Sequence, residues 1–204
     1  STIGIEVEND ICRLRNSIET VFDVGANYGQ TAIRFSKAFP SAIIHSFEPV
    51  ESNFRILKKK TFRYSKVLLV KEGLDSHPGR ARIGLSENPG GHSLNLANNS
   101  KKSEIISLNT VDEYRLENNI HFIDLLKIDV EGRELNVLKG SKNLLDRSQI
   151  AFIYAECILS ADDSAPHTLF NDLRDFLNDY GFHIFAFYHE AFNLKSGSAL
   201  ANVL

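Results

Sequence analysis

The stretch that most constrains the fold covers residues 20–35, TVFDVGANYGQTAIRF. A short apolar run ends at Asp23, glycines follow at Gly25 and Gly29, and apolar residues with helical spacing begin at Ala32. This order predicts a strand, a tight turn and a helix, because glycine accepts positive φ and lets a ligand approach the backbone. The turn is a candidate nucleotide-binding element, although a glycine turn of this kind also occurs in α/β proteins without one.

The spacing within this turn argues against a dinucleotide. Asn27 stands where the G-x-G-x-x-G pattern has the glycine that lets a pyrophosphate sit on the helix N-terminus. A ligand without phosphates fits better. Glu48 follows about twenty residues later, an offset at which an acid can accept hydrogen bonds from two vicinal ribose hydroxyls. Its alternative role is that of an acid at a helix N-terminus, favoured by the helix dipole.

Composition narrows the class of protein. The 204 residues fit one domain over 1–204 without a linker, and the net charge of −3 argues against a nucleic-acid-binding surface. Cys12 and Cys157 are far apart and predict neither a disulfide framework nor a zinc site, so a reducing cytoplasm is expected. The apolar run at 151–159 is too short to span a membrane, and no signal-peptide pattern is present.

The remaining segments alternate between strand and helix patterns, which predicts a mostly parallel sheet with crossover helices. Residues 1–16 form a helix or an arm. Further strands are expected at 42–47, 67–70, 123–130 and 151–156, and further helices at 51–60, 133–139 and 167–180. Residues 80–85 and 104–108 resemble edge strands around a candidate mobile loop at 86–102, and strands at 182–188 and 199–204 suggest an antiparallel edge.

Nearly every expected parallel strand ends on or near an acid. Ligands of open parallel sheets bind outside the carboxyl ends of the strands, so these acids are expected to converge on one site. They are Asp23, Glu48, the segment 72–75, Asp129 and Glu156. Strand alternation also places Lys127, Asp129 and Glu131 on one face, where charges are costly unless paired. We therefore expect Lys127 to be a counter-ion and Asp129 to act in the chemistry.

Five segments together resemble the FkbM family of S-adenosylmethionine-dependent methyltransferases, from Thr20 to the C-terminus. They are FDVGANYG, FEP, LLKIDVEGRELNVLKG, HTLFNDL and GFHIFAFYHE. The resemblance implies a single-domain, Rossmann-like α/β fold whose seven-stranded, mostly parallel sheet has an antiparallel last strand and helices on both faces. It also implies O-methylation of a sugar, polysaccharide or polyketide hydroxyl.

The same resemblance implies roles for individual residues. The methionine part of the cofactor is held by the glycine turn, the ribose by Glu48, and the adenine lies near residues that follow the third strand. The implied cofactor-binding set is Asp23, Gly25, Asn27, Gly29, Glu48, Leu74, Asp75 and Asp129.

A hydroxyl acceptor has to lose a proton, so the reaction needs a base or a metal. Asp129 is the best-placed base, with Glu131 beside it, and both could share a divalent ion with Glu156, since hard cations prefer carboxylate oxygens. His92, in the 86–102 loop, and His189 are alternative bases. The variable segments 86–102 and 160–166 are expected to bind the acceptor, a small molecule or a glycan.

Three other functions were weighed. Asn27 disfavours a nicotinamide-dependent oxidoreductase, and the V-E-G sequence after Asp129 lacks the proline–aromatic turn of nucleic-acid amino-methyltransferases. A non-catalytic module that binds the cofactor or a glycan as a scaffold remains the alternative, although the pair Asp129 and Glu131 favours an enzyme.

Overall fold

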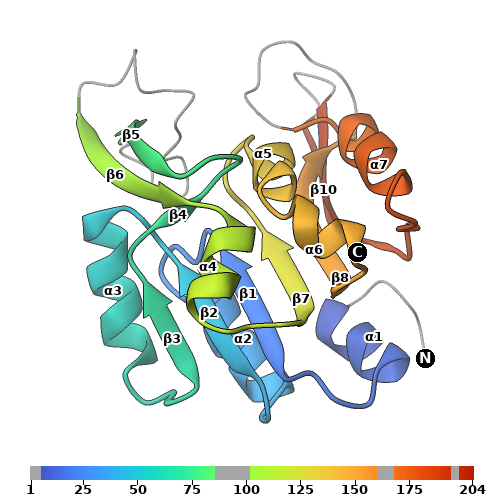
Figure 1. The fold of residues 1–204 in the computed structure, drawn as a ribbon, viewed down its shortest axis with the longest axis horizontal. Helices are drawn as coiled ribbons and strands as arrows, with labels where there is room; N and C mark the ends of the chain where they lie inside the picture. The colour runs from blue at the N-terminus through green and yellow to red at the C-terminus, as the bar shows by residue number, and fades with distance from the viewer. Residues whose placement is uncertain (1–5, 86–101, 160–167, 194–197) are drawn as a thin grey trace.

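A seven-stranded sheet forms the centre of the computed structural model, which describes residues 6–85, 102–159, 168–193 and 198–204 (Figure 1). The strand order is β3-β2-β1-β7-β8-β10-β9, and the neighbours are parallel except where β10 takes part. The strands are β1 (Thr20–Val24), β2 (Ile43–Phe47), β3 (Val67–Val70), β7 (Ile123–Ile128), β8 (Ile150–Ile158), β9 (Phe187–Asn193) and β10 (Ser198–Val203).

Alternation along the central strands divides the core into two halves. In β1 and β7, Phe22 and Leu126 pack into one apolar cluster, whereas Val21 and Leu125 pack into the other. Because both faces of these strands are covered, their sequences are almost continuously apolar rather than alternating with polar residues. This explains why charged residues within these strands, such as Asp23 and Lys127, stand out in the sequence.

Helices cover both faces of the sheet, as expected (Figure 1). On one face lie α1 (Val7–Leu14), which lies within the predicted helix or arm at 1–16, and α2 (Gln30–Ala38). The other face carries α4 (Val111–Glu117), α5 (Glu134–Lys139), α6 (Lys142–Asp146) and α7 (Phe170–Asn178). The remaining helix, α3 (Glu51–Thr61), follows β2.

A separate three-stranded sheet corrects one prediction. The segments expected as edge strands form β5 (Gly79–Gly84) and β6 (Ser103–Asn109), which pair with each other in antiparallel register and not with the main sheet. Parallel pairing of β6 with β4 (Gly73–Leu74) completes the three-stranded sheet. Its buried side chains Ile83 and Ile106 pack on Val50 in a small apolar cluster, separate from the two clusters of the main sheet.

The C-terminal strands correct a second prediction. A strand was expected at 182–188, but β9 begins only at Phe187, and the antiparallel strand β10 is not at the edge. Instead β10 lies between β8 and β9, with Val203 opposite Ala155 on one side and Phe187 on the other. The last strand is antiparallel as predicted, but β9 forms the edge.

The order of the strands reverses between β1 and β7, because β1 leads to β2 on one side while β7 lies on the other. In open α/β sheets, ligands bind at the carboxyl ends of the strands at such a point. In the described parts of the chain, no helix has the length and apolarity needed to cross a bilayer.

Candidate active site

The glycine turn after β1 consists largely of left-handed backbone. The φ angles of Gly25, Asn27 and Gly29 are 77°, 49° and 83°. Glycine adopts this conformation without strain, and asparagine is among the few other residues that tolerate it. The left-handed backbone therefore gives a local reason for the asparagine at position 27. This reason adds to the argument from the spacing that the ligand carries no phosphate.

Backbone amides of this turn already have acceptors within the protein. Phosphate-binding turns point such amides at the ligand, whereas four of these are engaged in internal hydrogen bonds. The turn is thus poorly suited to a phosphate. The bonds, of 2.8–3.1 Å, run from Gly25 N and Ala26 N to Phe47 O, from Asn27 N to the Glu48 carboxylate, and from Gly29 N to Ala26 O.

A buried ammonium group ties the turn to the adjacent strand β7. Lys127 Nζ lies 3.1 Å from the Asp23 carboxylate and 3.5 Å from that of Asp129, and it donates to Gly25 O at 3.0 Å. Burial alone would lower the pKa of Lys127, but the two carboxylates outweigh it and raise the pKa above its ordinary value. The expected counter-ion role of Lys127 is confirmed, with Asp23, its register partner on β1, as the nearer acid.

A cavity of about 280 Å³ opens at the carboxyl ends of β1, β2 and β7. Most of the predicted site residues line it, so the structure brings them together from five segments of the chain. They are Gly25, Asn27, Glu48, Leu74, Asp75, Asp129, Glu131 and Glu156.

Two predicted cofactor-binding residues lie behind the wall of this cavity. Asp23 is fully buried and pairs with Lys127, and Gly29 is packed against α3. A Cβ atom on Gly29 would lie 2.7 Å from the Leu57 side chain, so close helix packing explains the glycine. Both residues support the turn instead of lining the cavity.

Two histidines, His92 and His189, are the alternative candidates for the base. His92 lies outside the described residues, as does the loop over 86–101. For His189 the structure describes the backbone, which belongs to β9. Neither histidine is therefore placed relative to the cavity.

Glu48 is the buried acid of the cavity. Its side chain is 5% exposed, one carboxylate oxygen accepts from Asn27 N and the other from Val50 N, each at 2.9 Å. A carboxylate oxygen has two lone pairs, so each keeps the capacity to accept a second hydrogen bond. Burial raises the pKa of Glu48 to about 7, against the lowering effect of the two amides.

Three further carboxyl groups face the cavity from β7, its following loop and β8. Burial, and to a lesser extent the charge of Asp129, raises the pKa of Glu131 to about 7 and that of Glu156 to about 8. Groups with such values exchange protons readily near neutral pH. The cavity also favours a cationic ligand, which would relieve the repulsion among these acids.

The predicted metal site is not supported by this geometry. Asp129, Glu131 and Glu156 line the same cavity, yet among the described residues no three His, Cys, Asp or Glu side chains are grouped as metal ligands. The carboxyl groups are therefore considered as hydrogen-bond and proton acceptors.

Asp75 forms part of a polar network at the cavity wall. One oxygen accepts from the Arg133 guanidinium at 2.6 and 2.8 Å, and the other from Asn136 Nδ2 at 3.0 Å and Ser76 N at 2.7 Å. Burial raises the pKa of Asp75, but these bonds outweigh it, so the pKa lies below its ordinary value. The network fixes the segment after β4 against α5.

Sequence reasoning missed the wall formed by the small sheet. Ile83, Ile106 and Leu108 line the cavity, and so does Arg133. Their sequence context contains no motif, because the wall arises only when β5 and β6 fold back over the main sheet. Arg133 lies within the K-I-D-V-E-G-R-E segment, and its charge next to the acids of that segment could have indicated that it belongs to the site.

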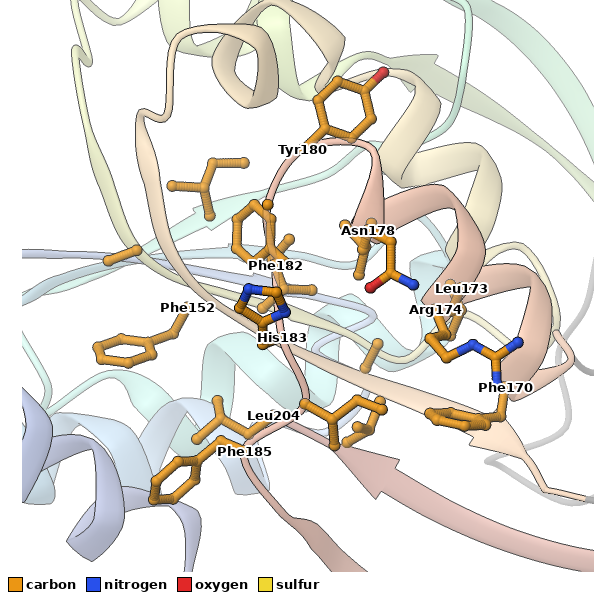
Figure 2. Close-up of a pocket in the computed structure, with 18 of the residues that line it drawn as sticks. Phe152, Phe170, Leu173, Arg174, Asn178, Tyr180, Phe182, His183, Phe185 and Leu204 are labelled. Carbon is orange, nitrogen blue, oxygen red and sulfur yellow. The ribbon is translucent and has the colours of Figure 1, made fainter.

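A larger cavity of about 380 Å³ lies elsewhere, between α7, the first half of β8 and residues 180–185. Figure 2 shows aromatic rings around it, among them Phe152, Phe170, Phe182 and Phe185. Its lining includes none of the carboxylates that follow β1, β2 and β7. The smaller cavity, where acids and the glycine turn converge, is therefore the candidate active site.

Comparison with known proteins identifies the family of the domain. The family model described as the methyltransferase FkbM domain matches residues 23–184. The chain belongs to the FkbM methyltransferase domain family. A relative named Methyltransferase 1, from Beauveria bassiana, is 26% identical over 147 residues, which are 59% of this chain and 57% of the relative. The chain thus spans little more than half of that protein.

Solved structures share the fold at low sequence identity. The METTL16 methyltransferase domain aligns over 97% of this chain and 64% of its own, with a TM-score of 0.54 and 12% identity. The 1,6-didemethyltoxoflavin-N1-methyltransferase of Burkholderia thailandensis, with S-adenosylhomocysteine bound, aligns over 96% and 75%, with a TM-score of 0.51 and 11% identity. The FkbM domain therefore has the Rossmann-like methyltransferase fold.

The first prediction concerns Gly25, where a Cβ atom would lie 1.8 Å from the backbone oxygen of Asp129. Gly181 has a similar φ of 79° but open space around it, so it serves as the control. Gly181→Ala should cost about 1–2 kcal/mol for left-handed backbone alone. Gly25→Ala should cost at least about 2 kcal/mol more through the clash, measured by chemical denaturation. Equal losses in the two variants would refute the close-approach argument.

The second prediction uses Glu156, whose folded-state pKa of about 8 exceeds its ordinary 4.5. The folded protein then holds a proton that the unfolded chain releases, so this stabilisation is full below about pH 4.5 and is lost as the pH rises through 8. Glu156→Gln should raise the Tm at pH 8.5 by about 2–4 °C, and by less at pH 6. Calorimetric scans of wild type, Glu156→Gln and the control Glu113→Gln, which lies at an exposed position, check this. Parallel pH profiles of the Tm for wild type and Glu156→Gln would contradict it.

Proposed function

We propose that this chain is an S-adenosylmethionine-dependent O-methyltransferase, which methylates a hydroxyl of a sugar, polysaccharide or polyketide-type acceptor. Membership of the FkbM family and the Rossmann-like fold support methyl transfer. The hydroxyl acceptor rests on the residues of the cavity and on the family resemblance of the sequence.

The observation that carries the proposal is the pairing of Glu48 with a turn whose amides are already engaged. A ribose offers two vicinal hydroxyls, and the two oxygens of Glu48 each have a lone pair left for one of them. The occupied amides of Gly25 and Ala26 argue against a diphosphate. Together these features match a nucleoside cofactor that has a ribose and no phosphate.

The other cavity residues fit the rest of this cofactor. Asn27 Oδ1 is buried without a hydrogen-bond partner among the described residues, which suits an ammonium donor. The acids Asp129, Glu131 and Glu156 create a negative environment for a sulfonium and an amino group. Leu74 and Asp75, which also line the cavity, are proposed to border the adenine, as the family resemblance implies.

The bound cofactor supplies an electrophilic methyl group on sulfur. An acceptor hydroxyl that takes this methyl group would have to lose its proton, and a carboxylate of the cavity would receive it. Asp129, whose side chain is 40% exposed and is paired with Lys127, is placed to accept the hydroxyl hydrogen bond. Glu131, with its pKa near 7, can hold the released proton.

The charge of the cavity also limits the acceptor. Asp129, together with the fraction of Glu48 and Glu131 that is ionised near neutral pH, disfavours a polyanion, which supports a small molecule or a glycan over nucleic acid. A non-catalytic module that binds the cofactor without turnover remains the alternative. It would bind S-adenosylmethionine yet release no S-adenosylhomocysteine with any acceptor of a glycan and macrolide panel.

The third prediction tests the ribose-binding role of Glu48. Glu48→Ala removes both acceptors, so affinity for S-adenosylhomocysteine should fall at least about tenfold, since hydrogen bonds to charged groups contribute about 1.5–3 kcal/mol. Glu51→Ala is the matched control, because its carboxylate pairs with Arg55 and Lys71 outside the cavity. Isothermal titration calorimetry makes the comparison. An affinity unchanged in Glu48→Ala would exclude the proposed role, and no binding by wild type would overturn the proposed function.

The fourth prediction concerns Asp129. Asp129→Asn keeps the shape of the side chain but removes the charge, so S-adenosylhomocysteine production should fall at least about 100-fold. Cofactor affinity should change by less than about threefold. Product release is measured by mass spectrometry with a panel of sugars and polyketides on which wild type is active. Full turnover by Asp129→Asn would assign the proton transfer to another group.

A further inference from the structure

Glu134 is a buried carboxylate that the proposed reaction does not use. Its side chain is 1% exposed at the start of α5, and Glu134 is not part of the cavity lining. One oxygen, Oε1, accepts from Val130 N and from Gly132 N, both at 3.1 Å. The other, Oε2, accepts from Thr168 Oγ1 at 2.5 Å. A buried charge is costly, and here three donors compensate for it.

The loop that Glu134 holds has an unfavourable backbone. Glu131 has a φ of 55°, and Gly132 has a φ of 94°. Left-handed backbone at a residue other than glycine persists only when the surroundings impose it. The two hydrogen bonds to Glu134 come from the residues immediately before and after Glu131. They therefore fix the peptide units 129–130 and 131–132, which bracket the strained residue.

Thr168 extends this support to a second element. Its carbonyl oxygen accepts from Ile158 N at 3.0 Å, and the next residue, Leu169, forms a parallel bridge with Ile158. Thr168 thus lies where the end of β8 meets the start of α7. Through its two oxygens, Glu134 connects the loop after β7 to this junction, so β7, β8 and α7 share one buried carboxylate.

From this geometry we infer that Glu134 is a positioning residue, which holds the loop 129–132 so that Asp129 and Glu131 face the cavity. It acts through the backbone and does not contact the cofactor or the acceptor. The inference rests on the proposed function for its effect on cofactor binding, whereas its effect on the loop stands independently.

The test compares three variants of the full chain. Glu134→Ala removes all three hydrogen bonds. Glu134→Gln removes the charge, yet its amide oxygen can still accept from both backbone amides, and its NH₂ group can donate to Thr168 Oγ1. Leu138→Ala truncates a fully buried side chain of the same helix and controls for lost stability without touching the loop.

Amide hydrogen exchange, followed by NMR, reads the loop directly. In Glu134→Ala, protection of the Val130 and Gly132 amides should fall at least about tenfold more than in Leu138→Ala. A displaced loop would move Asp129, Val130 and Glu131 out of the cavity wall together, a larger change than loss of the Asp129 charge alone. Affinity for S-adenosylhomocysteine, measured by calorimetry well below the Tm, should therefore fall about tenfold in Glu134→Ala and less than about threefold in Glu134→Gln and Leu138→Ala. Rescue by glutamine would show that geometry, rather than charge, is what Glu134 supplies.

The outcomes separate this inference from the proposed function. Unchanged protection and affinity in Glu134→Ala, or an equal loss in Leu138→Ala, would overturn the positioning role. Absence of cofactor binding in wild type would overturn the function, while the exchange data still decide the role of Glu134. If Glu134→Ala does not fold, Thr168→Val replaces it, with an expected loss of protection at the same two amides about threefold above that in Leu138→Ala; equal protection in these two variants would overturn the inference.

Discussion

The site depends on the contacts of the buried Lys127 ammonium group with the two carboxylates and the backbone around it. Lys127 lies in register with Asp23 across β1 and β7, the pair of strands between which the order of the sheet reverses. By donating to Val24 O and Gly25 O, it also holds the start of the glycine turn. Removing Lys127 would leave Asp23 buried and unpaired, and a buried charge without a partner typically costs about 3–5 kcal/mol. The strand pairing, the turn and Asp129 are therefore linked by one charge.

The cavity has two walls of different origin. The main sheet supplies the glycine turn, Glu48 and Asp129. The small sheet supplies Ile83 and Ile106, which pack mainly with each other and Val50. Because the two walls have separate cores, residues of the small sheet can change without disturbing the strands that hold Glu48.

Much of the main sheet was predictable, because the buried parallel strands of this chain are apolar runs, each followed by an acid. This pattern placed Glu48 and Asp129 correctly at the cavity. The helix α4 was missed, although Thr110 caps it by accepting from Glu113 N, in the T-x-x-E pattern of helix starts. The supporting position of Asp23 was not predictable, since sequence cannot tell whether an acid at a strand end faces a cavity or a lysine on the neighbouring strand. Nor could pairing of β5 with β6 be foreseen, because it depends on contacts between segments distant in the chain.

The position of β10 has a consequence for how the domain assembles. β9 precedes β10 in the chain, yet β9 reaches the sheet only through β10, which pairs with β8 on its other side. During synthesis, β8 therefore presents an unpaired edge until residues 198–203 have emerged, about 40 residues after its own completion. Exposed strand edges promote association between chains. The edge of β8 that pairs with β10 includes Glu156. This residue lines the cavity, and it also makes the unpaired edge of β8 less apolar.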